Sequence, residues 1–229
     1  PMQPNMSVID ETGAAHSLSH CIGKGGQGEV WLTQNGRRIV KFLNQSCNAD
    51  TMRRQFAFLR RLDLSGLNVA KPLVALKPPH VGYVAEFLAD MVPLETLLKC
   101  PPGQSLPWHL QTGGLRRRLR LLARTGEALL GLHARGVVYA DLSPRNVFIS
   151  ARAESLETWL IDLDNLCYEE DPRRSIYTPG YGAPEVVQGV AGSTSLSDAW
   201  AFAVLVWEVL TLRHPFVGDL VEGGTPEME

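Results

Sequence analysis

The spacing of hydrophobic positions divides the chain into a strand-rich first part and a more helical second part. Apolar runs at residues 30–33 and 38–42 flank an Asn-Gly pair, which is the strongest short signal for a β-hairpin. A further strand is predicted at residues 81–86, and residues 1–20 are expected to be a polar lead-in with one short strand. Because strands come first and helices later, the pattern predicts an α+β fold with two lobes.

Helical spacing begins at Asp50, which is suited to cap a helix that runs to Leu62. Residues 100–114 are rich in proline and glycine and are expected to form a loop, after which a second helix should end at Gly136. An apolar helix from about Leu196 to Leu212 is expected to be buried. The positions predicted to share one face of the second helix, away from most of its arginines, are Leu115, Leu119, Leu122, Gly126, Leu129 and His133.

The composition is that of an ordinary globular protein. Of 229 residues, 45% are hydrophobic and 20% are charged, which suits one large domain or two small lobes that share a cleft. The net charge of −2 provides no basic field for nucleic acid, and we find neither an apolar run long enough to span a membrane nor a signal peptide. We therefore expect a cytoplasmic protein without nucleic-acid or membrane partners.

The cysteines, at positions 21, 47, 100 and 167, show no metal-ligand spacing, so reduced thiols in a cytosolic protein are expected. Of the 22 basic residues only five are lysine, an arginine-rich composition typical of a GC-rich bacterial source. A lysine within an apolar strand therefore stands out in this chain.

A glycine-rich segment at residues 23–30 fits the pattern G-x-G-x-x-G-x-V, with glycines at positions 23, 25, 26 and 28. Glycines allow the backbone to approach phosphate closely and to direct its N–H groups toward the oxygens. A dinucleotide-binding fold would require a helix after the glycines. Here Val30 begins a strand, so a hairpin that covers phosphates fits better.

Lys41 lies in the second strand of the predicted hairpin. Strand alternation places Val40 and Phe42 on one face of the sheet, and Ile39 and Lys41 on the other. Such a lysine can extend from an edge strand into water. Because the glycine-rich segment lies just upstream, we favour a lysine directed at nucleotide phosphates.

Two aspartates and one asparagine follow short apolar strands. In phosphoryl transfer, an aspartate such as Asp141 can accept the proton of the substrate hydroxyl, and the oxygen of Asn146 can bind Mg²⁺. Asp162 closes a further apolar strand, where a metal ion could use it. Either residue of the first pair alone could be a turn former, and Asp162 could simply end its strand.

The order of these motifs resembles that of the eukaryotic-like serine/threonine protein kinases of bacteria and eukaryotes, over residues 15–217. The resemblance rests on the glycine segment, on the strand lysine and on five further motifs. These are a hinge at residues 83–88, D-L-S-P-R-N at 141–146 for D-L-K-x-x-N, D-L-D at 162–164 for D-F-G, T-P-G-Y-G-A-P-E at 178–185, and S-D-A-W at 197–200.

The resemblance implies a two-lobed kinase fold that binds ATP and Mg²⁺ or Mn²⁺. Residues 1–86 would form a β-rich lobe with one main helix, and this lobe would cover the nucleotide. Residues 87–229 would form a mostly helical lobe without the family's last helices. Catalytic roles fall to Asp141 and Lys41, metal binding to Asn146 and Asp162, and the gatekeeper position to Ala85. The implied nucleotide contacts are Ile22, Gly23, Gly25, Gly26, Gly28, Val30, Ile39, Lys41, Glu86, Leu88 and Phe148.

Several supporting residues depart from the family pattern. Gln55 stands where a helix glutamate pairs with the lysine, and an amide cannot neutralise that charge. Tyr139-Ala140 replaces His-Arg, which removes the partner of a phosphorylated activation loop. Ser143 replaces a lysine near the γ-phosphate, and Asp164 replaces the glycine of D-F-G.

These motifs favour transfer of the ATP γ-phosphate to serine or threonine of a protein substrate, because the segment at 178–185 resembles a peptide-docking loop. One alternative is a pseudokinase that acts as a nucleotide-binding interaction module, which the substituted supporting residues suggest. A second alternative is a small-molecule phosphotransferase of related fold.

Overall fold

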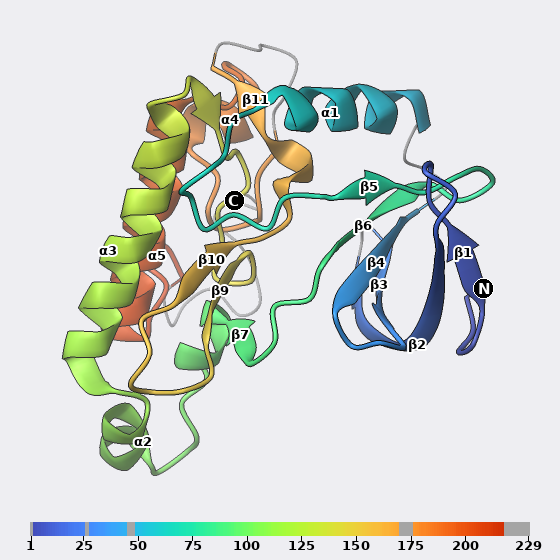
Figure 1. The fold of residues 1–229 in the computed structure, drawn as a ribbon. Helices are drawn as coiled ribbons and strands as arrows, with labels where there is room; N and C mark the ends of the chain where they lie inside the picture. Colours follow the sequence, from blue (N-terminus) through green and yellow to red (C-terminus); the bar gives the residue numbers. More distant parts are fainter. Residues whose placement is uncertain (1, 26–27, 45–48, 170–175, 218–229) are drawn as a thin grey trace. The chain divides into compact units, whose positions relative to one another are not determined.

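The computed structural model describes residues 2–25, 28–44, 49–169 and 176–217. The chain forms two compact units, one from residues 1–65 and 70–89, the other from residues 66–69 and 90–229 (Figure 1). Strands dominate the first unit, and the long helices α3 (Gly114–His133) and α5 (Ser195–Thr211) belong to the second. The predicted α+β class is confirmed.

The first unit contains an antiparallel six-stranded sheet in the order β1-β2-β3-β4-β6-β5. The predicted hairpin and the strand at 81–86 are confirmed, but the single strand expected within residues 1–20 is wrong, because two are present there. They pair so that Val8 and Leu18 are buried, and their alternation with polar residues hides this burial in the sequence. The strands are β1 (Ser7–Ile9), β2 (Ala15–Gly25), β3 (Gly28–Thr33), β4 (Arg38–Leu43), β5 (Val74–Ala75) and β6 (Gly82–Glu86).

Helix α1 (Ala49–Arg61) belongs to the same unit and agrees with the helix predicted from Asp50. Val40 and Phe42 join one buried apolar cluster of the sheet. Ile39 packs instead against a second cluster, which includes Phe56 of α1. The predicted alternation of faces along β4 is therefore confirmed.

The turn between β1 and β2 is held by the buried carboxylate of Asp10. It accepts hydrogen bonds from the backbone N–H groups of Thr12 and Ala14, from the Thr12 hydroxyl, and lies 2.8 Å from His16 Nε2. Burial opposes ionisation, but the bonds from His16, Thr12 and Ala14 outweigh it and lower the pKa of Asp10 from 3.8 to about 2.

Replacing Asp10 by asparagine is expected to lower the free energy of unfolding by about 1–2 kcal/mol at neutral pH. A depressed folded-state pKa contributes stability above the ordinary value of 3.8, and this stability is lost as the pH falls toward about 2. Denaturant unfolding of the wild type and Asp10→Asn across this pH range should therefore converge at low pH. A difference that stays constant with pH would contradict this assignment.

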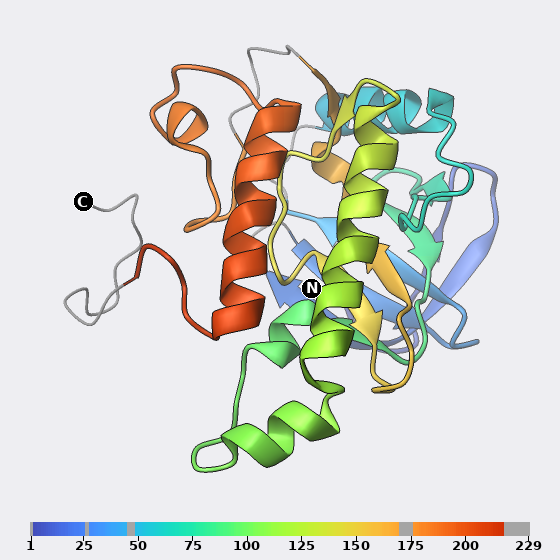
Figure 2. The ribbon, with the colours of Figure 1, turned by 90° about the vertical axis from the view of Figure 1, so that its left-hand side faces the viewer.

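The second unit combines the long helices α3 and α5 with short strands (Figure 2). Helices α3 and α5 pack against each other, and the predicted helix at 196–212 is confirmed as α5. Among the described helices, none is long and apolar enough to cross a membrane. The remaining elements are β7 (Met91–Pro93), η1 (Leu94–Leu97), α2 (Ser105–Gln111), β8 (Val137–Val138), β9 (Val147–Ser150), β10 (Thr158–Leu160), η2 (Leu163–Asn165), β11 (Cys167–Tyr168) and α4 (Pro184–Val187).

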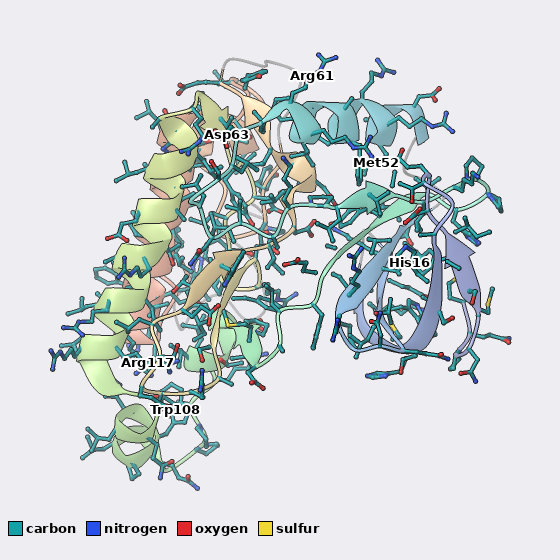
Figure 3. The ribbon with its side chains drawn as sticks, viewed as in Figure 1. His16, Met52, Arg61, Asp63, Trp108 and Arg117 are labelled. Atoms are coloured by element: carbon teal, nitrogen blue, oxygen red, sulfur yellow. The ribbon has the colours of Figure 1, made fainter. Side chains whose placement is uncertain are left out.

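Two expectations for this unit are wrong. The loop expected at 100–114 contains α2, and Leu115 and Leu119 of α3 are exposed, whereas Arg117 and Arg118 are buried. The guanidinium of Arg117 donates to four backbone carbonyl groups, and that of Arg118 lies 5.1 Å from the Trp108 ring centroid (Figure 3). These contacts satisfy buried arginines in a way that hydrophobic spacing cannot reveal.

Candidate active site

Strand pairing in the first unit aligns the predicted phosphate-binding residues. Gly23 pairs with Val30, Val30 pairs with Lys41, and Lys41 pairs with Tyr83. Strand β4 lies between β3 and β6, and Lys41 is only 7% exposed, so it is not a lysine that extends from an edge strand. Its Nζ atom lies 5.7 Å from the centroid of the Tyr83 ring.

The glycine segment turns from β2 into β3. Gly25 pairs with Gly28 at the end of the ladder, and Gly26 lies outside the described residues. A Cβ atom at Gly28 would lie 1.8 Å from the carbonyl oxygen of Phe42, so only glycine fits there. The close approach of β3 to β4 therefore depends on this glycine.

The other predicted nucleotide contacts are distributed over both units. Ile22 is exposed on β2, and Glu86 is exposed at the end of β6, with Leu88 partly buried just beyond. Ala85 is buried and pairs with Ile39 on the neighbouring strand. Phe148 lies on β9 of the second unit and is partly buried.

Gln55, in the position of the family's helix glutamate, is buried on α1. Its side chain is 5% exposed, so an amide rather than a carboxylate lies within the first unit at this point. A neutral amide can accept hydrogen bonds but contributes no net charge. The substitution of the family's glutamate by Gln55 therefore lies at a buried position, where charge–charge interactions are stronger than at the surface.

Asp141 lies between β8 and β9 in the second unit and is held by donors on several segments. Its Oδ1 atom accepts a 2.6 Å hydrogen bond from the hydroxyl of Thr178. Its Oδ2 atom accepts bonds from the side-chain amides of Asn146 and Asn165, at 3.3 and 3.4 Å. A hydroxyl donor and two amides thus fix the orientation of this carboxylate.

Asn146 and Asp162 are brought together by the β9–β10 pair. The backbone N–H of Ile161 donates to the carbonyl oxygen of Asn146 at 3.0 Å, so Asp162 follows directly beside it. The Asn146 side chain uses its amide nitrogen to bond Asp141, which leaves the amide oxygen directed away from Asp141. Asp162 adopts a left-handed backbone with φ of 59°.

These residues fit a magnesium ion that retains other ligands. Asn146 and Asp162 offer amide and carboxylate oxygens, the hard donors that Mg²⁺ prefers, and Mg²⁺ commonly takes only one or two carboxylates together with water and phosphate. Within the described part of the chain, no group of three or more His, Cys, Asp or Glu side chains is placed to hold a metal. The two oxygen donors of Asn146 and Asp162 would leave other positions of such an ion to further ligands.

Tyr139 bonds the backbone just before β9 and just after β10, next to Asn146 and Asp162. Its hydroxyl donates to the carbonyl oxygen of Ile161 and lies 3.4 Å from that of Asn146. Complete burial, followed by the negative charges of Asp162 and Asp141, raises the pKa of this phenol well above its ordinary value. The hydroxyl therefore stays protonated and remains a donor.

The Tyr139→Phe variant is expected to lower the free energy of unfolding by about 1–3 kcal/mol, because it leaves a buried carbonyl oxygen without its donor. It should also reduce the rate of any phosphoryl transfer several-fold, since the Ile161 carbonyl directly precedes Asp162. Denaturant unfolding and initial rates of the same preparation would measure both effects. Unchanged stability and unchanged rate would contradict a positioning role for the hydroxyl.

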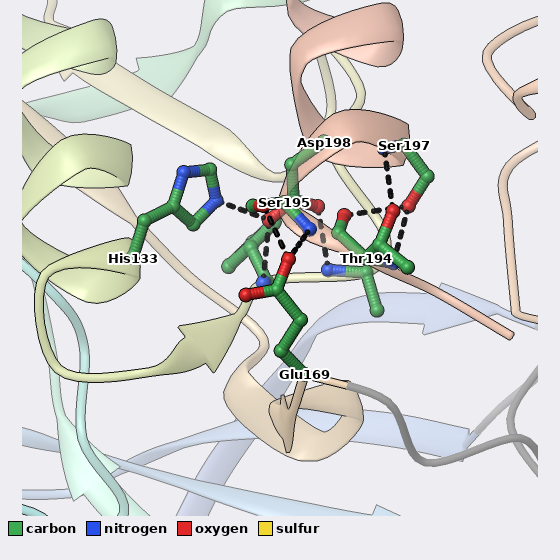
Figure 4. A network of polar contacts seen from close by, with 8 residues as sticks. His133, Glu169, Thr194, Ser195, Ser197 and Asp198 are labelled. Carbon is green, nitrogen blue, oxygen red and sulfur yellow. Dashed lines mark hydrogen bonds and ion pairs between the residues drawn. The ribbon is translucent and has the colours of Figure 1, made fainter.

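Asp198, near the start of α5, supports the loop that carries Asp141 (Figure 4). Its two carboxylate oxygens accept the backbone N–H groups of Tyr139 and Ala140, at 2.7 and 2.8 Å. Its Oδ2 atom also lies 2.8 Å from His133 Nε2. Ala140 has φ of 71°, a conformation that a non-glycine residue holds only when its surroundings enforce it.

The start of α5 is itself anchored by the residues that directly precede Asp198. Thr194 and Ser197 form a capping box, in which each side chain bonds the other residue's backbone N–H. Glu169 accepts hydrogen bonds from the backbone N–H and hydroxyl of Ser195, which lower the pKa of its carboxyl group (Figure 4). The helix end thus positions the aspartate that holds the catalytic loop.

Sequence reasoning missed the bonds that orient Asp141. Asp198 was noticed only as part of a motif, and nothing in the sequence connected it with residues nearly sixty positions earlier. Asn165 and Thr178 were also not assigned to Asp141, although both belong to or directly adjoin the recognised motifs. The missing information is tertiary contact, which motif spacing alone does not contain.

Comparison with known proteins agrees with this arrangement. The family model described as the protein kinase domain matches residues 17–224. Serine/threonine-protein kinase pkn2 of Myxococcus xanthus is 31% identical over 214 residues, covering 87% of this chain and 24% of that protein. Serine/threonine-protein kinases PkaB and PkaA of Streptomyces coelicolor are 27% and 24% identical, each over 90% of this chain and over 51% and 40% of their own length.

The chain therefore belongs to the protein kinase family. It is a protein kinase domain, and its sequence is similar to those of the bacterial serine/threonine-protein kinases named above. It spans between about a quarter and a half of the length of these relatives.

Proposed function

We propose that this chain transfers the γ-phosphate of ATP, with Mg²⁺, to serine or threonine hydroxyl groups of a protein substrate. The observation that supports this most strongly is the hydrogen bond from the Thr178 hydroxyl to Asp141 Oδ1. A threonine hydroxyl there already makes the bond that a substrate hydroxyl would make with a catalytic base. Family membership supports the reaction class.

Each predicted site residue has a role in this proposal. Asp141 accepts a hydrogen bond from the substrate hydroxyl and orients it. It takes the hydroxyl proton as the oxygen bonds the γ-phosphorus and ADP leaves. Asn146 and Asp162 would hold Mg²⁺, which neutralises developing charge on the phosphates. The predicted phosphate ligands are Lys41 and the glycine segment at residues 23–28. The predicted adenine contacts, as the family resemblance implies them, are Ile22, Val30, Ile39, Glu86, Leu88 and Phe148.

A pseudokinase remains the main alternative, and buried Gln55 is the observation that favours it. Where the family usually supplies a carboxylate to the lysine, this chain supplies a neutral amide. The proposal therefore predicts that Gln55→Glu preserves or raises activity.

The reaction is tested by mixing the protein with ATP labelled in its γ-phosphate, Mg²⁺ or Mn²⁺, and two sets of acceptors. One set contains generic protein substrates, and the other contains small alcohols and amines. Label on protein serine or threonine supports the proposal. Label only on small molecules would favour a small-molecule phosphotransferase, and ATP binding without transfer to any acceptor would favour a pseudokinase.

A further inference from the structure

Arg145 lies in the catalytic loop between Asp141 and Asn146, but it points to a different partner. Its Nε atom donates to Glu95 Oε1 at 3.0 Å, and its side chain is 76% exposed. Among the described residues, this guanidinium donates to no second acceptor, which agrees with its high exposure. A guanidinium held through Nε presents a fork of N–H groups suited to a carboxylate.

Both carboxylate oxygens of Glu95 accept hydrogen bonds from cations, so Glu95 offsets only one of two neighbouring positive charges. Its second oxygen accepts a 2.7 Å bond from Lys99, and its backbone N–H donates to the Pro144 carbonyl oxygen in the catalytic loop. The bonds from Lys99 and then Arg145 lower the pKa of Glu95, so it stays ionised. Two cations and one anion leave a net charge of +1, and Glu95 is the least exposed of the three, at 24%.

Another carboxylate that contacts the docking segment is also occupied. Tyr181, in the segment that resembles a peptide-docking loop, donates its hydroxyl to half-buried Glu208. Burial and this bond raise the pKa of Tyr181, so its hydroxyl stays a donor. The Thr178 hydroxyl of the same segment bonds Asp141, in the loop that carries Arg145, which places the docking segment beside this loop. A substrate that reaches this surface meets exposed cations, whereas both carboxylates already have donors.

We propose that Arg145 makes acidic residues flanking the phosphorylated serine or threonine a determinant of the peptide substrates of this enzyme. The inference rests on the proposed function, because it concerns the substrate of the same site. The carboxylate of an aspartate or glutamate in the substrate pairs with the terminal nitrogens of Arg145, while Glu95 holds the guanidinium in place. Such a charge-assisted pair is stronger than a neutral hydrogen bond and excludes like-charged partners.

The test is a peptide library in which each position flanking a central serine or threonine is varied among acidic, neutral and basic residues. For the wild type, kcat/KM should be about tenfold higher for the best acidic peptide than for its neutral counterpart, the ratio that about 1.4 kcal/mol provides. Arg145→Gln should abolish the preference, and Arg145→Glu should reverse it in favour of basic peptides. Activity toward the neutral peptide reports any general damage to the loop.

Arg124→Glu provides a matched control, because Arg124 of α3 is also an exposed arginine paired with a glutamate, Glu127, at 2.8 Å. This variant should keep the acidic preference. No transfer by the wild type to any peptide would overturn both this inference and the proposed function. Efficient transfer without an acidic preference, or a preference unchanged in Arg145→Glu, would overturn this inference alone.

Discussion

The Asp141→Asn variant is expected to transfer phosphate about a hundred- to ten-thousand-fold more slowly than the wild type, with little change in ATP affinity. Asparagine has the same shape and can still accept the short hydrogen bond from the Thr178 hydroxyl. Its amide nitrogen loses only the two longer bonds from Asn146 and Asn165, so the loop should keep its fold. It cannot take the proton of the substrate hydroxyl, and it lacks the charge that attracts that proton. The loss should therefore appear in kcat, with the nucleotide Kd preserved.

The measurement combines initial rates of phosphorylation with a separate titration of ATP binding. Asp90→Asn is a suitable control, because Asp90 is exposed in the same unit and has φ of 57°, which asparagine tolerates well. The control should retain wild-type activity. If Asp141→Asn also retained full activity, Asp141 would not be the catalytic base.

The Asp198→Ala variant is expected to have the second large effect, because it removes a buried carboxylate that accepts two backbone N–H groups of the catalytic loop. Each buried donor left without a partner costs about 1–3 kcal/mol, so the free energy of unfolding should fall by about 3–5 kcal/mol. Without this anchor, Ala140 is also free to leave its strained backbone conformation, which would displace Asp141. The midpoint temperature of thermal unfolding and kcat should both decrease.

Asp198→Asn keeps the effect measurable if the alanine variant does not fold. Asparagine offers one acceptor oxygen where the two N–H groups of Tyr139 and Ala140 need two, so kcat should fall while part of the stability remains. Ser195→Ala is the control, since it disturbs only the exposed bonds with Glu169 in the same network. An Asp198→Asn enzyme with wild-type kcat would show that this anchor is not needed for catalysis.

The hairpin at residues 30–42 and the face of the sheet that carries Lys41 were predictable because they rest on local rules. An Asn-Gly turn fixes the hairpin, and strand alternation fixes which side chains share a face. The glycine at position 28 is also explained locally, since β4 leaves no room for a Cβ atom. These features need no knowledge of distant parts of the chain.

The extent of helix α3 was predicted, but its buried face only in part. Leu122 and Leu129 are buried as predicted, whereas the first turns bury arginine in place of Leu115 and Leu119, because that choice depends on distant carbonyl groups. Arg117 is buried since four carbonyl oxygens, from residues before α3 and around the end of β9, accept its donors. For the same reason, the role of Asp198 became visible only when α5 and the catalytic loop were seen together. Sequence spacing predicted the reacting groups, whereas the groups that hold them required tertiary structure.

The central claim is tested most directly by following ADP and phosphorylated protein in the same reaction with ATP and Mg²⁺. The account predicts that wild-type protein produces ADP and phosphoserine or phosphothreonine in equal amounts, and that both products nearly vanish in Asp141→Asn. ADP formed without phosphorylated protein, or equal phosphorylation by the wild type and Asp141→Asn, would contradict it.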